Sequence, residues 1–138
     1  MTDAHDLQRF VDAQQGVYPT ALAELTRGRK ATHWMWFVFP QIAGLGHSAM
    51  AQRYAIRSTD EARAYLAHPL LGFRLVEATR AVTGAPGSAE AIMGSIDAVK
   101  LRSSLTLFAA TADDPAPFEA ALDRFFGGTR DPETMRRL

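Results

Sequence analysis

The sequence predicts an all-α protein that folds as a single multihelical domain over residues 1–138. Apolar residues recur at spacings of three and four through most of the chain, which is the pattern of helices with one buried face. Alternating strands that face each other across a tight turn are missing from the pattern, so the sequence offers little from which to build a sheet. At 138 residues the chain is long enough to bury about two-thirds of its unfolded surface in one core.

Apolar spacing predicts the helices of the N-terminal part. Two helix faces can be traced there, the first from Leu7, Phe10 and Val11 and the second from Val17, Ala21, Leu22 and Leu25. Gly28 is expected to end the second helix. Residues 33–39 carry apolar side chains on two faces, which is typical of a central helix or a buried turn, and Pro40 should end this segment.

The middle of the chain contains a capping box. Ser58 is placed to accept a hydrogen bond from the amide of Glu61, whose side chain is placed to reach back. This predicts a helix within 58–68 that Pro69 ends or restarts. The next helix is predicted over 70–84, with Gly84 as its stop. Its apolar face consists of Leu71, Leu75, Ala78 and Val82.

The C-terminal part begins with a short turn or helix over 88–94. Residues 95–112 are assigned to a helix, although the stretch LTLF within them would by itself suit a strand. For the following helix, Asp114 is the expected cap, Pro115 the first helical residue, and Gly127 and Gly128 the stop. The segment DPETMRRL repeats the Asp-Pro start on a smaller scale.

Composition excludes several classes of protein. Hydrophobic residues make up 47% of the chain and charged residues 22%, which is typical of a globular domain rather than a disordered one. Fifteen basic residues balance fifteen acidic ones, so neither a nucleic-acid nor an anionic-membrane partner is expected. The chain contains no cysteine, which excludes disulfides and thiolate nucleophiles.

The expected location is cytoplasmic. The first residues, MTDAHDLQRF, lack the basic start and apolar run of a signal peptide. The longest apolar run, Trp34 to Pro40, is far shorter than the roughly 20 residues that a membrane-spanning helix needs. We therefore expect no membrane partner, and we expect a monomer.

Four stretches together resemble a known bacterial family. They are THWMWFVFPQIAGLGHSAMAQRYAI, EARAYLAHPLLGFRL, DAVKLRSSLTLFA and DRFFGG. They resemble domain-of-unknown-function family 1810, whose members often carry the name calpastatin, and the resemblance extends from DLQRFVDAQ to DPETMRRL. It implies a single multihelical domain and brings no activity, substrate or cofactor. The calpastatin name belongs to an extended, disordered inhibitor, whereas this composition is that of a core-forming chain.

The stretch ATHWMWFVFPQIAGLGHS, residues 31–48, contains the first candidates for a site. Trp34 and Trp36 either belong to the core or form an aromatic surface on which a flat ring stacks. His33 beside them is either a core histidine or a general base, and it is the single catalytic candidate. The histidines do not have the spacing of metal ligands, so no metal site is predicted. The acidic residues Glu24, Glu61, Glu77 and Glu119 are expected on solvent faces.

Two further groups of residues are candidates for binding an anion. Gln41, Gly44, Gly46 and Ser48 surround a predicted helix start, where free amides and the helix dipole favour a negative group, although an ordinary helix-entry loop would look the same. Lys100, Ser103 and Ser104 share one helix face at i, i+3 and i+4. They could bind an anion, or be a surface lysine beside two serines that bond their own helix.

These candidates favour binding of a small, anionic, ring-bearing metabolite such as a nucleotide. No cofactor is predicted. If the protein is an enzyme, a metal-independent hydrolase or transferase with His33 as general base is the compatible class. The alternative is a protein-interaction module in which the aromatic residues are core, and nucleic-acid binding is disfavoured by the neutral charge. The ligand's identity, turnover and the proximity of Lys100 to residues 33–48 stay open at this level.

Overall fold

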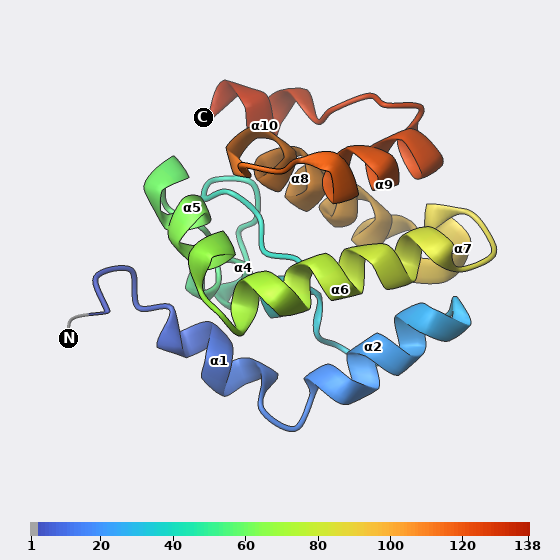
Figure 1. Ribbon diagram of the computed structural model, residues 1–138, viewed down its shortest axis with the longest axis horizontal. Helices are drawn as coiled ribbons and strands as arrows, with labels where there is room; N and C mark the ends of the chain where they lie inside the picture. The colour runs from blue at the N-terminus through green and yellow to red at the C-terminus, as the bar shows by residue number, and fades with distance from the viewer. Residues whose placement is uncertain (1–2) are drawn as a thin grey trace.

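The computed structural model describes residues 3–138 and has ten helices and no strands within that range (Figure 1). The all-α prediction is confirmed. The helices are α1 Gln8–Gln14, α2 Tyr18–Arg27, α3 Met35–Val38, α4 Ala49–Arg53, α5 Thr59–Ala67, α6 Leu71–Gly84, α7 Ala89–Met93, α8 Ser95–Thr111, α9 Ala116–Phe126 and α10 Pro132–Arg136.

Helix α8 lies at the centre of the packing and is the longest of these helices. It packs against α5, α7, α9 and α10, while α6 packs against α2, α5 and α9. Figure 1 shows α2 running alongside α6, on the side of α6 away from α8. The LTLF stretch is helical, and all four of its residues, 105–108, are buried. A helix that is covered on most sides needs apolar residues on most sides, which is why a strand-like run occurs within it.

Side-chain caps fix several helix starts where the sequence predicts them. Ser58 accepts from the amide of Glu61 at 3.0 Å, and Ser48 accepts from the amide of Ala51 at 3.1 Å. Asp131 caps α10 in the same way. Gly28 ends α2 with φ of 79°, a left-handed conformation that glycine adopts without strain.

Two local predictions need correction, and one open alternative is decided. The Glu61 side chain does not reach back to Ser58, because its two oxygens bind the guanidinium groups of Arg9 and Arg57. Helix α9 starts one residue later than expected, since Asp114 accepts from the amide of Ala116 at 3.1 Å and Pro115 is the cap. Of the two alternatives left open for the segment 33–39, the structure shows the buried turn, which contains only the four-residue helix α3.

The expectation that the four glutamates lie on solvent faces is wrong for two of them. Glu24 and Glu61 are each only 1% exposed. Both carboxylates are surrounded by hydrogen-bond donors, and this is the condition under which a charged group is tolerated in an interior.

The segment between α3 and α5 forms a closed loop. Ile42 and Ile56 make an isolated parallel bridge, in which the amide of Ala43 donates to Ile56 and the amide of Ile56 donates to Gln41, each at 2.8 Å. Both isoleucines are buried. Helix α4 lies within this loop, so the bridge fixes residues 41–57 against the core and positions the surface features described below.

Among residues 3–138, no helix combines the length and the apolar character required to cross a bilayer.

Candidate ligand-binding site

A surface hollow of about 420 Å³ lies between the start of α8, the 41–46 segment and the start of α10. Four of the predicted site residues, Gln41, Gly46, Lys100 and Ser103, line it together. They come from parts of the chain that are some sixty residues apart. The remaining lining residues are Leu45, Ile96, Val99, Asp131 and Glu133.

Lys100 lies between an aromatic ring and a carboxylate. Its ammonium nitrogen is 5.3 Å from the centroid of a Trp36 ring and 3.7 Å from Oδ1 of Asp97. The Lys100 side chain is 26% exposed, so the ammonium keeps access to solvent and to the hollow. An ammonium over an indole face is held there by the ring's quadrupole.

The second lysine of the chain is arranged in the same way. The ammonium of Lys30 is 5.0 Å from a Trp34 ring centroid and 2.9 Å from Oδ2 of Asp97. Asp97 therefore binds both lysines, and each lysine lies over one of the two tryptophans. The Lys30 side chain is only 8% exposed, so this pair is the more buried of the two.

Trp34 lies in the core, with no exposed surface. Its indole N–H donates to Oε1 of Glu24 at 2.9 Å, and the same oxygen accepts from the amide of Ala31 at 2.7 Å. Thr32 donates to Glu24 with both its amide and its hydroxyl. Burial raises the pKa of the Glu24 carboxyl, but the hydrogen bonds from Thr32, Ala31 and Trp34 outweigh it and lower the pKa to about 2.

Ser103 connects α8 to α10. Its hydroxyl lies 3.0 Å from Oδ2 of Asp131 and 3.2 Å from the carbonyl oxygen of Val99, so it also bonds its own helix. Asp131 further accepts from the amide and hydroxyl of Thr134. Burial raises the pKa of Asp131, and the bonds from Thr134 and Ser103 more than reverse this, leaving the pKa below its usual value.

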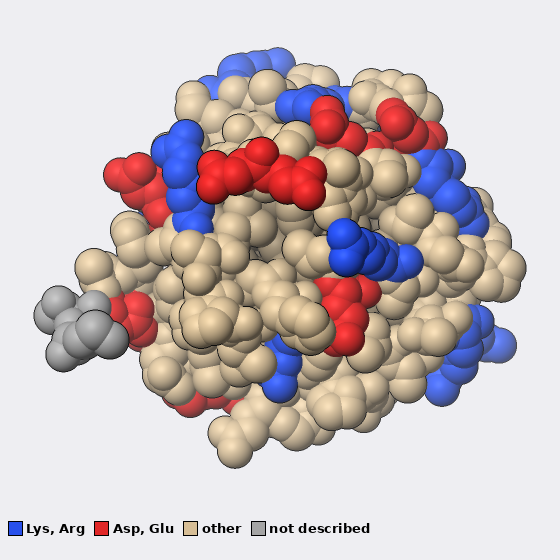
Figure 2. Space-filling view, viewed as in Figure 1, with Lys and Arg blue, Asp and Glu red and all other residues tan. Residues whose placement is uncertain are grey.

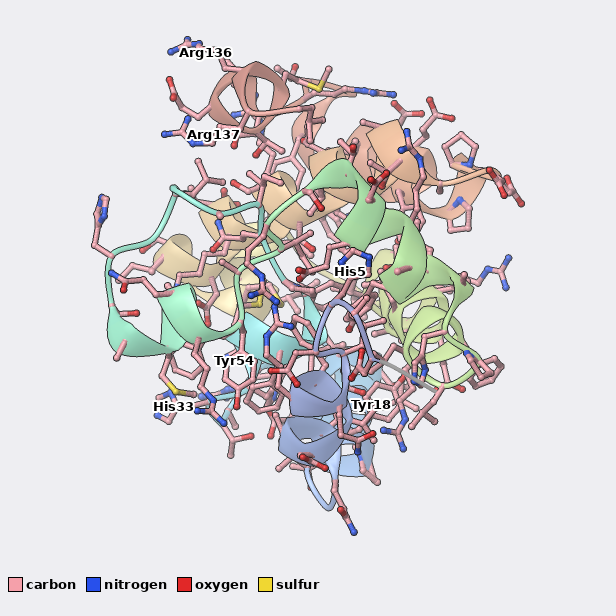
Figure 3. The ribbon with its side chains drawn as sticks, turned by 90° about the vertical axis from the view of Figure 1, so that its left-hand side faces the viewer. His5, Tyr18, His33, Tyr54, Arg136 and Arg137 are labelled. Atoms are coloured by element: carbon pink, nitrogen blue, oxygen red, sulfur yellow. The ribbon has the colours of Figure 1, made fainter. Side chains whose placement is uncertain are left out.

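The other predicted site residues lie outside this hollow. Ser104 is fully buried, and its hydroxyl has no hydrogen-bond partner within residues 3–138. Ser48 is exposed at the cap of α4. Gly44 has φ of 99°, and a Cβ there would lie 2.8 Å from Nε of Arg137. His33 is exposed and points away from the body of the molecule (Figure 3).

The comparisons with known proteins address the family. A model of the family described as "protein of unknown function (DUF1810)" matches residues 4–138. The chain belongs to this family.

A solved relative has the same fold as this DUF1810 protein. The crystal structure of the conserved hypothetical protein Rv1873 from Mycobacterium tuberculosis is similar, with 51% identity and a TM-score of 0.97 over 99% of this chain and 98% of that one. No curated protein matches the chain. Neither description supports the calpastatin name.

Sequence reasoning missed five of the nine residues that line the hollow in this DUF1810 protein. Ile96 and Val99, which were not among the candidates, are 73% and 67% exposed. Asp131 and Glu133 were identified only as part of a helix start. Within residues 3–138, no three acidic or histidine side chains come together in a way that could hold a metal ion.

Proposed function

We propose that this protein binds a small organic anion with a flat apolar part in the hollow between α8, α10 and the 41–46 segment. The observation that carries the proposal is the convergence of Gln41, Lys100 and Ser103 on one hollow with apolar sides. Its volume of about 420 Å³ falls in the range of pockets that hold small molecules.

The cation available to the ligand is Lys100. Asp97 lies nearer to Lys30, at 2.9 Å, than to Lys100, at 3.7 Å. The ion pair of this carboxylate with the more buried Lys30 is therefore the stronger of the two. Lys100 retains donors that can point into the hollow. An anionic ligand replaces water at this ammonium while Trp36 supports the lysine from beneath.

The two acidic residues that line the hollow already have partners. Asp131 accepts hydrogen bonds from Ser103 and Thr134. Glu133 binds Arg136 at 2.7 Å and Arg137 at 3.0 Å. The charge of Glu133 is therefore compensated by two guanidinium groups, which reduces the repulsion that an anion would meet there. Asp131 is hydrogen-bonded by neutral groups and stays ionised, so an anion would have to lie toward Lys100 and away from it.

The apolar part of the ligand would lie against Ile96, Val99 and Leu45. Burying an exposed side chain of this size contributes about 1.5–3 kcal/mol relative to leaving it in water. A flat ring would cover both Ile96 and Val99, which lie three residues apart on one face of α8. The proposal contains no catalytic step, since His33 is not among the residues that line the hollow.

The test is a thermal-shift screen against nucleotides, sugar phosphates and aromatic carboxylates. A ligand at a hundred times its dissociation constant should add about 2.7 kcal/mol to the free energy of unfolding. Lys100→Ala should abolish the shift, Lys100→Arg should keep part of it, and the exposed Arg27→Ala should not change it. A shift that survives in Lys100→Ala would contradict the proposal.

A protein-interaction module is the second candidate, and the exposure of Ile96 and Val99 favours it. Neighbouring exposed apolar side chains are typical of surfaces that bind another protein. Tryptophan fluorescence separates the two, because Trp36 lies under Lys100 and should respond to a metabolite bound there. A response to protein partners alone would favour the module.

A further inference from the structure

We propose that a second hollow, formed by α1 and residues 52–57, binds a phosphate group. It measures about 200 Å³ and does not depend on the site proposed above. Five of its six lining residues are polar, and three of these are arginines. The hollow is therefore lined by hydrogen-bonding and positively charged groups, unlike a packing defect between apolar side chains. The lining residues are Asp6, Arg9, Gln52, Arg53, Ala55 and Arg57.

Arg9 forms the fixed inner side of this hollow. Its side chain is 8% exposed, and all five of its N–H groups have acceptors. The acceptors are the carbonyl oxygens of Arg53, His5, Asp6 and Ala55 and Oε2 of Glu61, at 2.7 to 2.9 Å. These bonds connect α1 to residues 53–55. Arg9 therefore contributes charge and shape to the hollow and has no donor left for a ligand.

Arg53 has the donors that Arg9 lacks. Its Nε donates to the hydroxyl of Tyr54 at 3.2 Å, and its guanidinium carbon lies 5.6 Å from the centre of the Tyr54 ring. Neither Nη atom has an acceptor in the described part of the chain, and no carboxylate there lies within 4 Å of Arg53. The guanidinium is thus positioned by Tyr54 while its outer edge stays available.

Arg57 adds a second guanidinium with a free nitrogen. Its Nε binds Glu61 at 3.1 Å and one Nη binds the carbonyl oxygen of His5 at 3.1 Å, while the other Nη has no acceptor within residues 3–138. Figure 3 views this side of the molecule, with Tyr54 and His5 labelled on it. The planar fork of a guanidinium matches the oxygens of a phosphate, and two such groups can bind one phosphate together.

The local charge balance also favours an anion. Glu61 is shared between Arg9 and Arg57, so one carboxylate offsets two guanidinium groups. Arg53 adds another positive charge. Asp6 is the opposing group at the rim, and it has φ of 50°, the single non-glycine residue with positive φ in the described range. That conformation directs its carbonyl oxygen to Arg9, so the strain at Asp6 has a structural reason.

A neighbouring hollow provides room for the rest of a phosphate ester. It also measures about 200 Å³ and shares Gln52, Ala55 and Arg57 with the arginine-lined hollow. Its other side is formed by the small residues of the 42–46 segment and Ala51. Inorganic phosphate and a small phosphate monoester both carry the phosphate group that the arginines would bind. Comparing the affinity of the protein for each shows which of the two is the ligand.

The experiment is a calorimetric titration of the whole protein with inorganic phosphate and, separately, with glycerol 3-phosphate. Arg53→Gln should weaken binding by about tenfold or more, the loss expected when charge-assisted hydrogen bonds are removed. Asp6→Asn should tighten it several-fold, because a negative charge leaves the rim and asparagine tolerates positive φ. Arg63→Gln, which alters an exposed arginine of α5, should have no effect.

Tighter binding of glycerol 3-phosphate than of phosphate would identify an ester as the ligand, and equal affinity would identify phosphate alone. Absence of binding by the unaltered protein would overturn the proposal. So would equal losses in Arg53→Gln and Arg63→Gln, which would indicate a diffuse charge effect. Circular dichroism of each variant shows whether it is folded, and the Asp6→Asn gain is a result that misfolding cannot produce.

Discussion

Glu24 accepts the indole N–H of Trp34 in a region from which water is excluded. The two residues belong to α2 and to the start of α3, and the bond between them is 2.9 Å long. The same carboxylate binds the backbone of Ala31 and Thr32, so it fixes the chain that leads to both tryptophans. The segment that this carboxylate binds directly follows Lys30, whose ammonium binds Asp97, and Asp97 in turn binds Lys100.

Removing the Glu24 carboxylate should strongly destabilise the fold. Glu24→Ala leaves the buried indole N–H without an acceptor, which costs about 1–3 kcal/mol, and it removes three further hydrogen bonds, from the amides of Ala31 and Thr32 and the hydroxyl of Thr32, at about 0.5–1.5 kcal/mol each. We expect the free energy of unfolding to fall by at least about 3 kcal/mol in urea titrations. The exposed Glu119→Ala is the control, and its loss should stay within about 1 kcal/mol. Similar losses in the two variants would contradict this role.

Glu24 should also make stability depend on pH in the acid range. Its pKa is about 2 in the folded protein against an ordinary value of 4.5, so the folded state favours the ionised form. A lowered pKa contributes stability above pH 4.5 and loses it as the pH falls toward 2, by about 3 kcal/mol in total. Urea titrations between pH 7 and pH 2.5 should show this loss. In Glu24→Gln the slope should be smaller, and an unchanged slope would refute the assignment.

The buried ion pair between Arg9 and Glu61 leads to a second stability prediction. Arg9→Leu leaves the Glu61 carboxylate without its most buried partner and removes the bonds to residues 53–55. Breaking such a pair costs about 3–5 kcal/mol. Arg63→Leu breaks the exposed pair with Asp60 and should cost less than about 1 kcal/mol. Thermal unfolding of both variants measures the difference.

The helices were largely predictable because their signals are local. Ser58 lies three residues before Glu61, and Asp131 lies directly before Pro132. In both cases the capping residue and the helix start that it indicates are within a few positions of each other in the sequence. The helix 95–111 was correctly assigned although part of it resembles a strand. Seventeen residues is long for a strand and ordinary for a helix.

The buried carboxylates were not predicted, because their partners come from elsewhere in the chain. Glu61 is 52 residues from Arg9, and nothing in the spacing relates them. For Glu24, the sequence did contain an indication that the side chain is buried. It follows Ala21 by three residues and precedes Gly28 by four, on the apolar face of α2, where a carboxylate must be buried with donors.

The candidate site was predicted only in part, for the same physical reason. Gln41, Gly46, Lys100 and Ser103 were identified from residue type and face, and the fold brings them together. Whether Ile96 is covered depends on where α10 and the 41–46 segment pack against α8. The residues around Ile96 in the sequence carry no information about this packing. The charged surface in Figure 2 shows both signs interspersed, in agreement with the neutral composition.

Two adjacent serines of α8 should respond to alanine in opposite directions. Ser104 has a buried hydroxyl with no partner in the described residues, so Ser104→Ala removes an unsatisfied group and should stabilise the protein by about 1 kcal/mol. Ser103→Ala removes the bond to Asp131 and should destabilise it by about the same amount. Melting temperatures of the two variants test this. Destabilisation by Ser104→Ala would mean that the hydroxyl has a partner.

Asp97 should control both stability and affinity, in opposite directions. In Asp97→Asn the nearly buried Lys30 loses its carboxylate, and the free energy of unfolding should fall by about 1–3 kcal/mol. Lys100 loses its competing anion at the same time, so an organic anion in the α8 hollow should bind several-fold more tightly. Calorimetry and urea titration on one preparation measure both effects. The gain in affinity should disappear when Lys100→Ala is added, and a gain that persists there would show that another cation binds the ligand.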